Sequence, residues 1–186
     1  MKRIFDLVLS VISSLLLILP ILVVAVFVKI TSKGPILYWS GRVGKDNKLF
    51  AMPKFRSMKT DTPAVATHLL QDPASLLTPI GGFLRKSSLD ELPQLWCILK
   101  GDMSFVGPRP ALFNQDDLIE LRTQQGVDKL LPGLTGWAQV NGRDELPIPK
   151  KVALDTEYIS KKSFWFDIYI IWLTFVKVLK RDGVSH

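Results

Sequence analysis

The chain has 186 residues, of which 47% are hydrophobic and 22% are charged. This length supports one modest domain with its own core, and this composition excludes a disordered or collagen-like chain. The single cysteine, Cys97, excludes an intrachain disulfide, and His68 and His186 show no spacing typical of a zinc site, so a bound metal is expected to be a hard cation on oxygen ligands.

Positive charge gathers in the first third of the chain. Lys and Arg outnumber Asp and Glu by 24 to 17. Residues 1–60 hold ten Lys or Arg against two acids, whereas the remaining 126 residues are nearly neutral, with 14 against 15. A basic region around an apolar run predicts contact with anionic lipid headgroups or phosphates. Binding of nucleic acid is the alternative, and it is disfavoured because no known nucleic-acid-binding motif is present.

Residues 1–30 predict a membrane segment. No charged residue interrupts Leu7–Val28, and as a helix this run is long enough to cross a bilayer of ~30 Å. Pro20 removes one helical hydrogen bond and predicts a bend. Because both flanks are basic, we expect both ends on the cytoplasmic side, as in a re-entrant helix. A straight span, a signal peptide and a buried helix of a soluble protein are the alternatives. Asp6 is expected at the headgroup edge, paired with Lys2 or Arg3.

The sequence pattern of residues 31–186 predicts one largely helical unit. Two short strand patterns at Ile36–Trp39 and Leu49–Met52 predict a small β-hairpin. Residues 60–79 and Gly133–Arg143 predict loops, the first with a short helix at Ala64–Leu70. Further helices are expected at Ile80–Lys86, Leu92–Leu99, Asp116–Gln125, Lys150–Lys161 and Phe164–Lys180. The last helix is apolar and aromatic, which favours a place in the membrane surface over a packed core helix.

An adjacent pair of acids is the most informative feature. Ser88 and Glu91 have the spacing of a capping box, and Pro93 favours a first helical turn, so Asp90 and Glu91 are expected near a helix N-terminus. The helix dipole favours the ionised carboxylates there. Two such acids can hold a divalent cation, attack a phosphorus atom or accept a proton. Helix capping alone is the alternative.

Basic and amide side chains lie near these acids in the sequence. Arg85, one to two turns before them, is suited to binding phosphate oxygens. Arg109 stands between two prolines, which restrict its backbone and favour a planar or anionic partner, although an ordinary solvent-facing arginine fits the same pattern. Pro132–Arg143 carries amide and guanidinium groups suited to a sugar or nucleotide, but glycine-rich loops are often only turns.

Four segments together resemble the small monotopic phosphoglycosyl transferases of the bacterial sugar transferase family. They are KFRSM at Lys54–Met58, RKSSLDELPQ at Arg85–Gln94, LKGDMSFVGPRP at Leu99–Pro110 and PGLTGWAQVNGR at Pro132–Arg143. The resemblance implies a predominantly helical α+β fold with a re-entrant membrane helix, interfacial amphipathic helices and a small β-hairpin. It also implies an active site on the cytoplasmic face of the bacterial inner membrane.

The same resemblance implies a reaction and a set of roles. A phospho-sugar would pass from a UDP-sugar to polyprenyl (undecaprenyl) phosphate with release of UMP, in the first membrane step of glycoconjugate assembly. Asp90 would be the nucleophile and would bind magnesium (Mg²⁺) together with the diphosphate, while Glu91 would accept the proton of the lipid phosphate. The residues expected to bind substrate are Arg85, Lys54, Arg56, Arg109, Gln139, Asn141 and Arg143.

Two rival functions stay open. In the first, the lipid phosphate attacks the donor directly in a ternary complex. In the second, the chain is a non-catalytic membrane tether. The sequence leaves the sugar, the pathway and the oligomeric state undetermined, and a UDP N-acetylated hexosamine or a deoxy derivative is our expectation for the donor. Two departures from the family pattern stand out: the kink reads Leu19-Pro20 where Ser-Pro is usual, and Pro53 lies beside a predicted strand.

Overall fold

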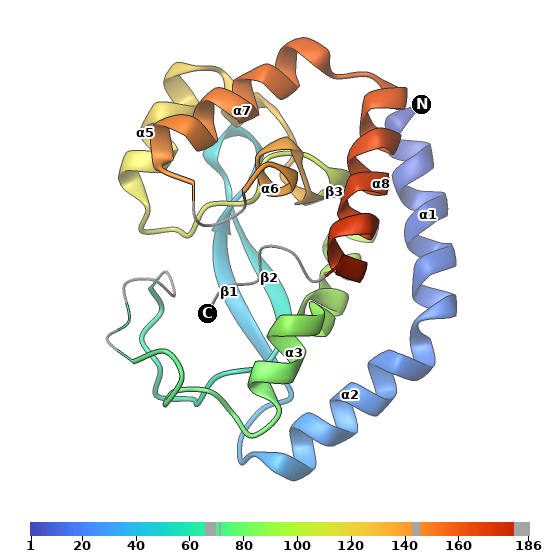
Figure 1. Cartoon of the computed structure of the whole chain (residues 1–186), viewed down its shortest axis with the longest axis vertical. Helices are drawn as coiled ribbons and strands as arrows, with labels where there is room; N and C mark the ends of the chain where they lie inside the picture. The colour runs from blue at the N-terminus through green and yellow to red at the C-terminus, as the bar shows by residue number, and fades with distance from the viewer. Residues whose placement is uncertain (66–69, 71, 143–145, 181–186) are drawn as a thin grey trace.

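The computed structural model describes residues 1–65, 70, 72–142 and 146–180 (Figure 1). Arg143, His68, His186 and most of the expected helix Ala64–Leu70 lie outside the described residues. Helices make up most of the described chain, and two small two-stranded sheets complete it. The predominantly helical α+β class is therefore confirmed.

The N-terminal segment is a bent pair of helices, α1 (Lys2–Leu16) and α2 (Ile18–Thr31). The two axes meet at 61°, and they are apolar and long enough for a membrane only as a pair; no single helix in the described ranges qualifies. The break falls at Leu17, just before the first turn of α2 that contains Pro20. The expected bend is therefore confirmed. Its physical cause is that Pro20 has no N–H to donate to the Leu16 carbonyl and that its ring clashes with that carbonyl in a straight helix.

Helix α1 turns its polar side chains inward and its apolar side chains outward. Asp6 and Ser10 are buried, and Asp6 accepts hydrogen bonds from Ser104 Oγ at 2.8 Å and from the Phe105 amide at 3.3 Å. The prediction that Asp6 pairs with Lys2 or Arg3 at a headgroup edge is wrong, because the backbone and hydroxyl of the domain satisfy its carboxylate. The exposed outer face consists of Ile4, Val8, Val11, Ile12, Leu15 and Leu16.

Two basic residues fasten the start of α1 to the domain. Lys2 pairs with Asp167 and donates to the Val106 carbonyl at 3.1 Å. Arg3 donates to the carbonyls of Ile98 and Leu99 at 2.5 and 2.8 Å, which close the end of helix α4 (Leu95–Lys100). Their charges therefore serve contacts within the protein.

The hairpin consists of β1 (Leu37–Val43) and β2 (Leu49–Phe55), joined through the 3₁₀ turn η1 (Lys45–Asn47), and both strands are longer than expected. The Arg56 amide donates to Ile36 O and the Gly44 amide to Lys48 O. Hydrogen-bonded pairs therefore alternate so that Pro53, opposite Trp39, takes a position without a ladder bond. This is why the strand tolerates the proline.

A second, parallel sheet pairs β3 (Ser104–Val106) with β4 (Gly133–Thr135), followed by the short helix α6 (Trp137–Val140). The prediction that Gly133–Arg143 is a loop is wrong as far as Val140, because β4 and α6 occupy most of this segment. A Cβ at Gly133 would lie 2.1 Å from Gly107 N, and one at Gly136 would lie 2.0 Å from Gly107 O. These glycines are needed because two backbones cross at close range.

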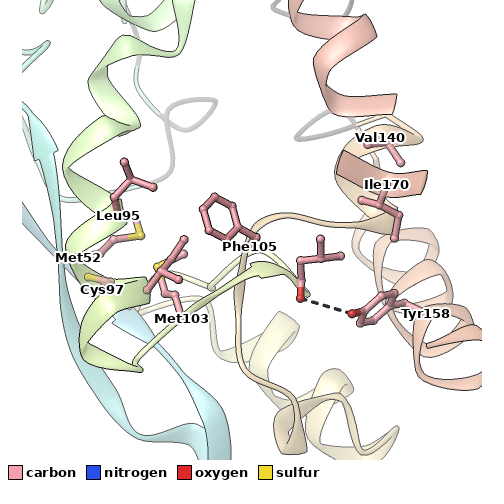
Figure 2. Packing of buried hydrophobic residues seen from close by; sticks show 10 residues of the cluster. Met52, Leu95, Cys97, Met103, Phe105, Val140, Tyr158 and Ile170 are labelled. Carbon is pink, nitrogen blue, oxygen red and sulfur yellow. Dashed lines mark hydrogen bonds between the residues drawn. The ribbon is translucent and has the colours of Figure 1, made fainter. Parts of the chain in front are cut away.

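Four further helices lie near their predicted positions, namely α3 (Gly81–Ser87), α5 (Asp116–Gln124), α7 (Ile148–Lys161) and α8 (Phe164–Lys180). The helix expected at Leu92–Leu99 is divided between the 3₁₀ helix η3 (Leu89–Gln94) and α4, and the 3₁₀ helix η4 (Val127–Lys129) was not predicted. In the main core, Phe105 of β3 lies between Met52, Leu95 and Cys97 on one side and Tyr158 and Ile170 on the other (Figure 2).

Helix α8 lies beside α1 (Figure 1), and only one of its faces is packed against the domain. Asp167 and Ile170 are buried against the domain, whereas Trp165, Trp172 and Phe175 are exposed. One face is thus a core face and the other is an aromatic surface.

Candidate active site

The acidic pair lies where α3 turns sharply into η3. Ser88 has φ 57°, a left-handed conformation that ends α3 and redirects the chain. Its side chain makes no capping hydrogen bond, so the predicted capping box is wrong, because the residue serves as the C-terminal turn of the preceding helix. Asp90 and Glu91 do occupy the first turn of the next helix, as expected, although it is a 3₁₀ helix.

Two cations from distant segments hold Glu91. Lys54 Nζ, on β2, lies 2.7 Å from Glu91 Oε1, and Arg109 Nη2, after β3, lies 3.0 Å from the same oxygen. Burial acts to raise the pKa of Glu91, but the charges and hydrogen bonds of Lys54 and Arg109 outweigh it and hold this pKa far below its usual range. Glu91 is therefore a fixed anion.

Asp90 has the opposite environment. Its side chain is buried, with the residue 7% exposed, and its carboxylate accepts no hydrogen bond within the described part of the chain. Burial, with a smaller contribution from the charge of Glu91, raises the pKa of Asp90 to about 6 against the charges of Lys54, Arg85 and Arg109. The pKa of Asp90 is therefore raised although the residue lies in a first helical turn, because desolvation is the largest effect.

Three predicted substrate-binding cations gather around the acids. Besides Lys54 and Arg109, Arg85 on α3 acts on Asp90 through its charge, and its Nη1 lies 3.4 Å from Met58 Sδ. Three positive and two negative side chains leave the cluster with a positive excess, which suits a phosphorylated ligand.

Comparison of the sequence with protein families identifies the class of protein to which this chain belongs. The family model described as bacterial sugar transferase matches residues 1–181. The chain belongs to the bacterial sugar transferase family.

Curated relatives of this sugar transferase include three informative proteins. The UDP-glucose:undecaprenyl-phosphate glucose-1-phosphate transferase of Escherichia coli (strain K12) is 44% identical over 95% of this chain and 40% of its own length. The UDP-galactose-lipid carrier transferase of Erwinia amylovora is 40% identical over 98% of this chain and 41% of its own length. The uncharacterized sugar transferase EpsL of Bacillus subtilis is 39% identical over 100% of this chain and 91% of its own length. The chain thus spans about two fifths of the first two relatives.

Other predicted substrate-binding residues of the sugar transferase lie elsewhere. Arg56 is buried and donates to the carbonyls of Pro35 and Ser32 at 2.7 and 3.0 Å, so it ties the end of α2 to the hairpin. Gln139 Nε2 donates to Leu134 O at 3.1 Å, and Asn141 Nδ2 donates to a carbonyl of its own helix. None of the three contacts the acidic pair through a hydrogen bond in the described part of the chain.

The acidic pair also bears on the expected magnesium. No group of three or more His, Cys, Asp or Glu side chains converges in the described residues. Magnesium usually takes one or two carboxylates and completes its shell with substrate phosphates and water. Asp90 supplies one carboxylate without a hydrogen bond, while Glu91 Oε1 already accepts from two cations. The residues therefore fit an ion held by Asp90 and a diphosphate.

Sequence reasoning missed three residues beside this site. Gln94, in the same 3₁₀ helix as the acids, is 1% exposed, and its Nε2 has no hydrogen-bond partner in the described structure. Its position three residues after Glu91 could have indicated that the two side chains lie on the same side of a 3₁₀ helix. Arg122 and Asp155 form a buried ion pair at 2.6 Å; they lie 33 residues apart, and no local pattern joins them.

Proposed function

We propose that this sugar transferase moves a phospho-sugar from a UDP-sugar to polyprenyl phosphate, with UMP as leaving group and a covalent phosphosugar on Asp90. Family membership supports the reaction class, and the Escherichia coli relative is named as a transferase of glucose 1-phosphate from UDP-glucose to undecaprenyl phosphate. The observation that carries the proposal is the asymmetry of the acidic pair, in which Glu91 is fixed by two cations and Asp90 is buried without a hydrogen bond from any described residue.

The environment of Asp90 suits a nucleophile. With a pKa of about 6, Asp90 is ionised at neutral pH yet more basic than an ordinary carboxylate, and it has no hydrogen bond to lose before attack. Lys54, Arg85 and Arg109 lower the repulsion between this anion and an incoming diphosphate. Magnesium, when bound, would supply further charge neutralisation on the diphosphate oxygens.

The proposed chemistry has two balanced steps. First, an Asp90 oxygen attacks the phosphorus attached to the sugar, and the bond from that phosphorus to UMP breaks, so that UMP leaves with the electron pair. Second, an oxygen of polyprenyl phosphate attacks the same phosphorus, and the bond to Asp90 breaks to regenerate the carboxylate. The products are UMP and a polyprenyl diphosphate sugar.

For Glu91 we propose a role that differs from the one the family resemblance implied. A carboxylate whose pKa lies far below its usual range is a poor proton acceptor. A phosphate monoester loses its second proton near pH ~6, so most of the lipid phosphate needs no base at neutral pH. Glu91 then serves to hold Lys54 and Arg109 at the site.

We further propose that α1 and α2 enter the inner membrane from the cytoplasmic face and return. The polar inner and apolar outer faces of α1 are the reverse of a soluble helix. Both ends of the pair are fastened to the same domain, through Lys2 and Arg3 at one end and through Arg56 and Ser32 at the other. The exposed aromatic face of α8 would lie in the interface.

The experiment uses purified protein with Mg²⁺ and UDP-glucose labelled in the sugar-linked phosphate, without lipid acceptor. UDP-glucose is the first donor because one relative is named for it, and UDP-galactose and UDP-N-acetylhexosamines follow in a panel. We expect UMP release and a labelled protein, with no label in Asp90→Asn and full label in the control Asp61→Asn, which changes an exposed turn.

Each rival function predicts a different result. Intersecting initial-rate patterns with no labelled protein would support direct attack in a ternary complex. Unchanged function in cells that carry Asp90→Asn and Glu91→Gln would support the non-catalytic tether. Full turnover by Asp90→Asn would refute the covalent mechanism.

A further inference from the structure

The segment Pro108–Ala111, which brings Arg109 to Glu91, is held by its carbonyl groups. Its prolines have no N–H, so at those two positions no backbone donor can fix it. Each of its four carbonyls instead accepts one hydrogen bond from another element. The donors to Pro108, Arg109, Pro110 and Ala111 are Gly133 N at 2.9 Å, Arg122 Nη1 at 2.7 Å, Arg42 Nη1 at 3.1 Å and Val43 N at 2.9 Å.

The donor to the Arg109 carbonyl is itself oriented by a buried acid. Arg122, on α5, donates through Nε at 3.0 Å and Nη2 at 2.6 Å to Asp155 Oδ2, on α7. Arg122 is 7% exposed and Asp155 is 1% exposed. Because the guanidinium is planar, two bonds to one carboxylate oxygen fix the direction of the remaining nitrogen, Nη1. That nitrogen points at the Arg109 carbonyl.

We propose that Arg122, oriented by Asp155, is a positioning residue that fixes the backbone of Arg109 so that its guanidinium reaches Glu91 and the donor phosphates. The part concerning donor phosphates rests on the proposed function, whereas the hold on Glu91 does not. The plain alternative is that Arg122 and Asp155 only join α5 to α7. A buried ion pair alone is weak evidence for stabilisation, because removing its charges from water offsets much of their attraction.

The first test measures whether Arg122 controls the contact between Arg109 and Glu91. Thermal unfolding in detergent is recorded for Glu91→Gln, Arg109→Gln and the double variant, first with Arg122 and then with Arg122→Lys, which keeps the charge but not the planar fork. With Arg122, we expect the two losses in Tm to be non-additive by at least ~2 °C. In the Arg122→Lys background we expect additivity within ~1 °C. The same coupling in both backgrounds would overturn the proposal.

Two more variants provide a second disruption of the same contact and a matched control. Asp155→Asn keeps the shape of the acid and should also abolish the coupling, which provides a second route if Arg122→Lys does not fold. Asp167→Asn is the matched control, because Asp167 is another buried acid that pairs with a cation, Lys2. This control should lower Tm and leave the coupling between Arg109 and Glu91 unchanged. Equal loss of coupling in the control would show a general structural effect and overturn the proposal.

The second test separates the positioning role from the proposed function. In the active enzyme, Arg122→Lys should raise KM for the UDP-sugar by about tenfold with a smaller change in kcat, and it should have no further effect on KM when Arg109 is already Gln. Coupling that depends on Arg122 in a protein that releases no UMP would refute the proposed function alone. Unchanged coupling in a protein that releases UMP would refute the positioning role alone.

Discussion

The environment of Asp90 predicts that removing its charge stabilises the protein. Burial is the main cause that raises its pKa from 3.8 to about 6. A difference of this size corresponds to about 3 kcal/mol, since one pKa unit is worth ~1.36 kcal/mol. The folded pKa lies above the unfolded one, so this contribution to stability is fully present below pH 3.8 and is lost as the pH rises through 6. At pH ~7.5 ionised Asp90 therefore disfavours the fold.

Asp90→Asn is neutral at every pH and escapes this penalty. At neutral pH we expect it to unfold at a higher temperature than the parent, by about 6–12 °C for a chain of this size. The gain should shrink as the pH falls below 6, should be small near pH ~4, and should vanish only well below pH 3.8, where Asp90 is protonated in both states. A gain in stability that accompanies loss of catalysis is typical of an active site in which charge is buried for chemistry.

The assay is thermal unfolding in detergent with EDTA, at several pH values between ~4 and ~8. EDTA is needed because a bound cation would stabilise ionised Asp90 in the parent and hide the difference. Asp61→Asn removes a negative charge from an exposed turn and should change Tm little at any pH. If Asp90→Asn were less stable than the parent at pH ~7.5, or if its advantage did not depend on pH, the argument from desolvation would be refuted.

Three further changes test other parts of the structure by unfolding or by distance measurement. Lys54→Met leaves Glu91 with one of its two cations and should lower the free energy of unfolding by about 2 kcal/mol, while Lys161→Met, in an exposed pair on α7, should leave Tm unchanged. Gln94→Met replaces a buried amide nitrogen that has no partner in the described residues. Burying such an unpaired donor costs about 1–3 kcal/mol, so its removal should not lower Tm; a clear decrease in Tm would show that the nitrogen has a hydrogen-bond partner. Pro20→Ala restores one helical donor, worth about 1 kcal/mol, which is too little to release the docked end of α1, so spin labels at the two ends of the helix pair should keep their distance.

Local patterns predicted most helices because local forces decide them. Helix α8 begins at Phe164 as predicted, and α5 ends beside Gly126, whose φ of 71° is easy only for glycine. The bend near Pro20 follows from a missing donor and needs no tertiary information. The acidic pair and its neighbour Arg85 are close in sequence, so their proximity was also predictable.

Long-range contacts decided what the sequence could not predict. Ser88 matched a capping pattern, yet its conformation depends on how α3 packs. The partners of Glu91 lie 37 and 18 residues away, and only the folded chain shows that they share one oxygen. Asp6 was expected at a lipid headgroup because only the basic residues near it are visible as partners in the sequence. Its actual partner, the amide of Phe105, lies 99 residues away.

The supports of the site extend to helix α1. Arg3 of α1 holds the carbonyls at the end of α4, and α4 continues directly from the 3₁₀ helix that carries Asp90. Asp6 of α1 holds the start of β3, and the chain after β3 leads to Arg109. Helix α1 thus supports both the segment that carries Asp90 and the segment that carries Arg109, one of the cations around the acidic pair. For this reason residues 1–30 belong to the support of the site, in addition to the membrane contact proposed for them.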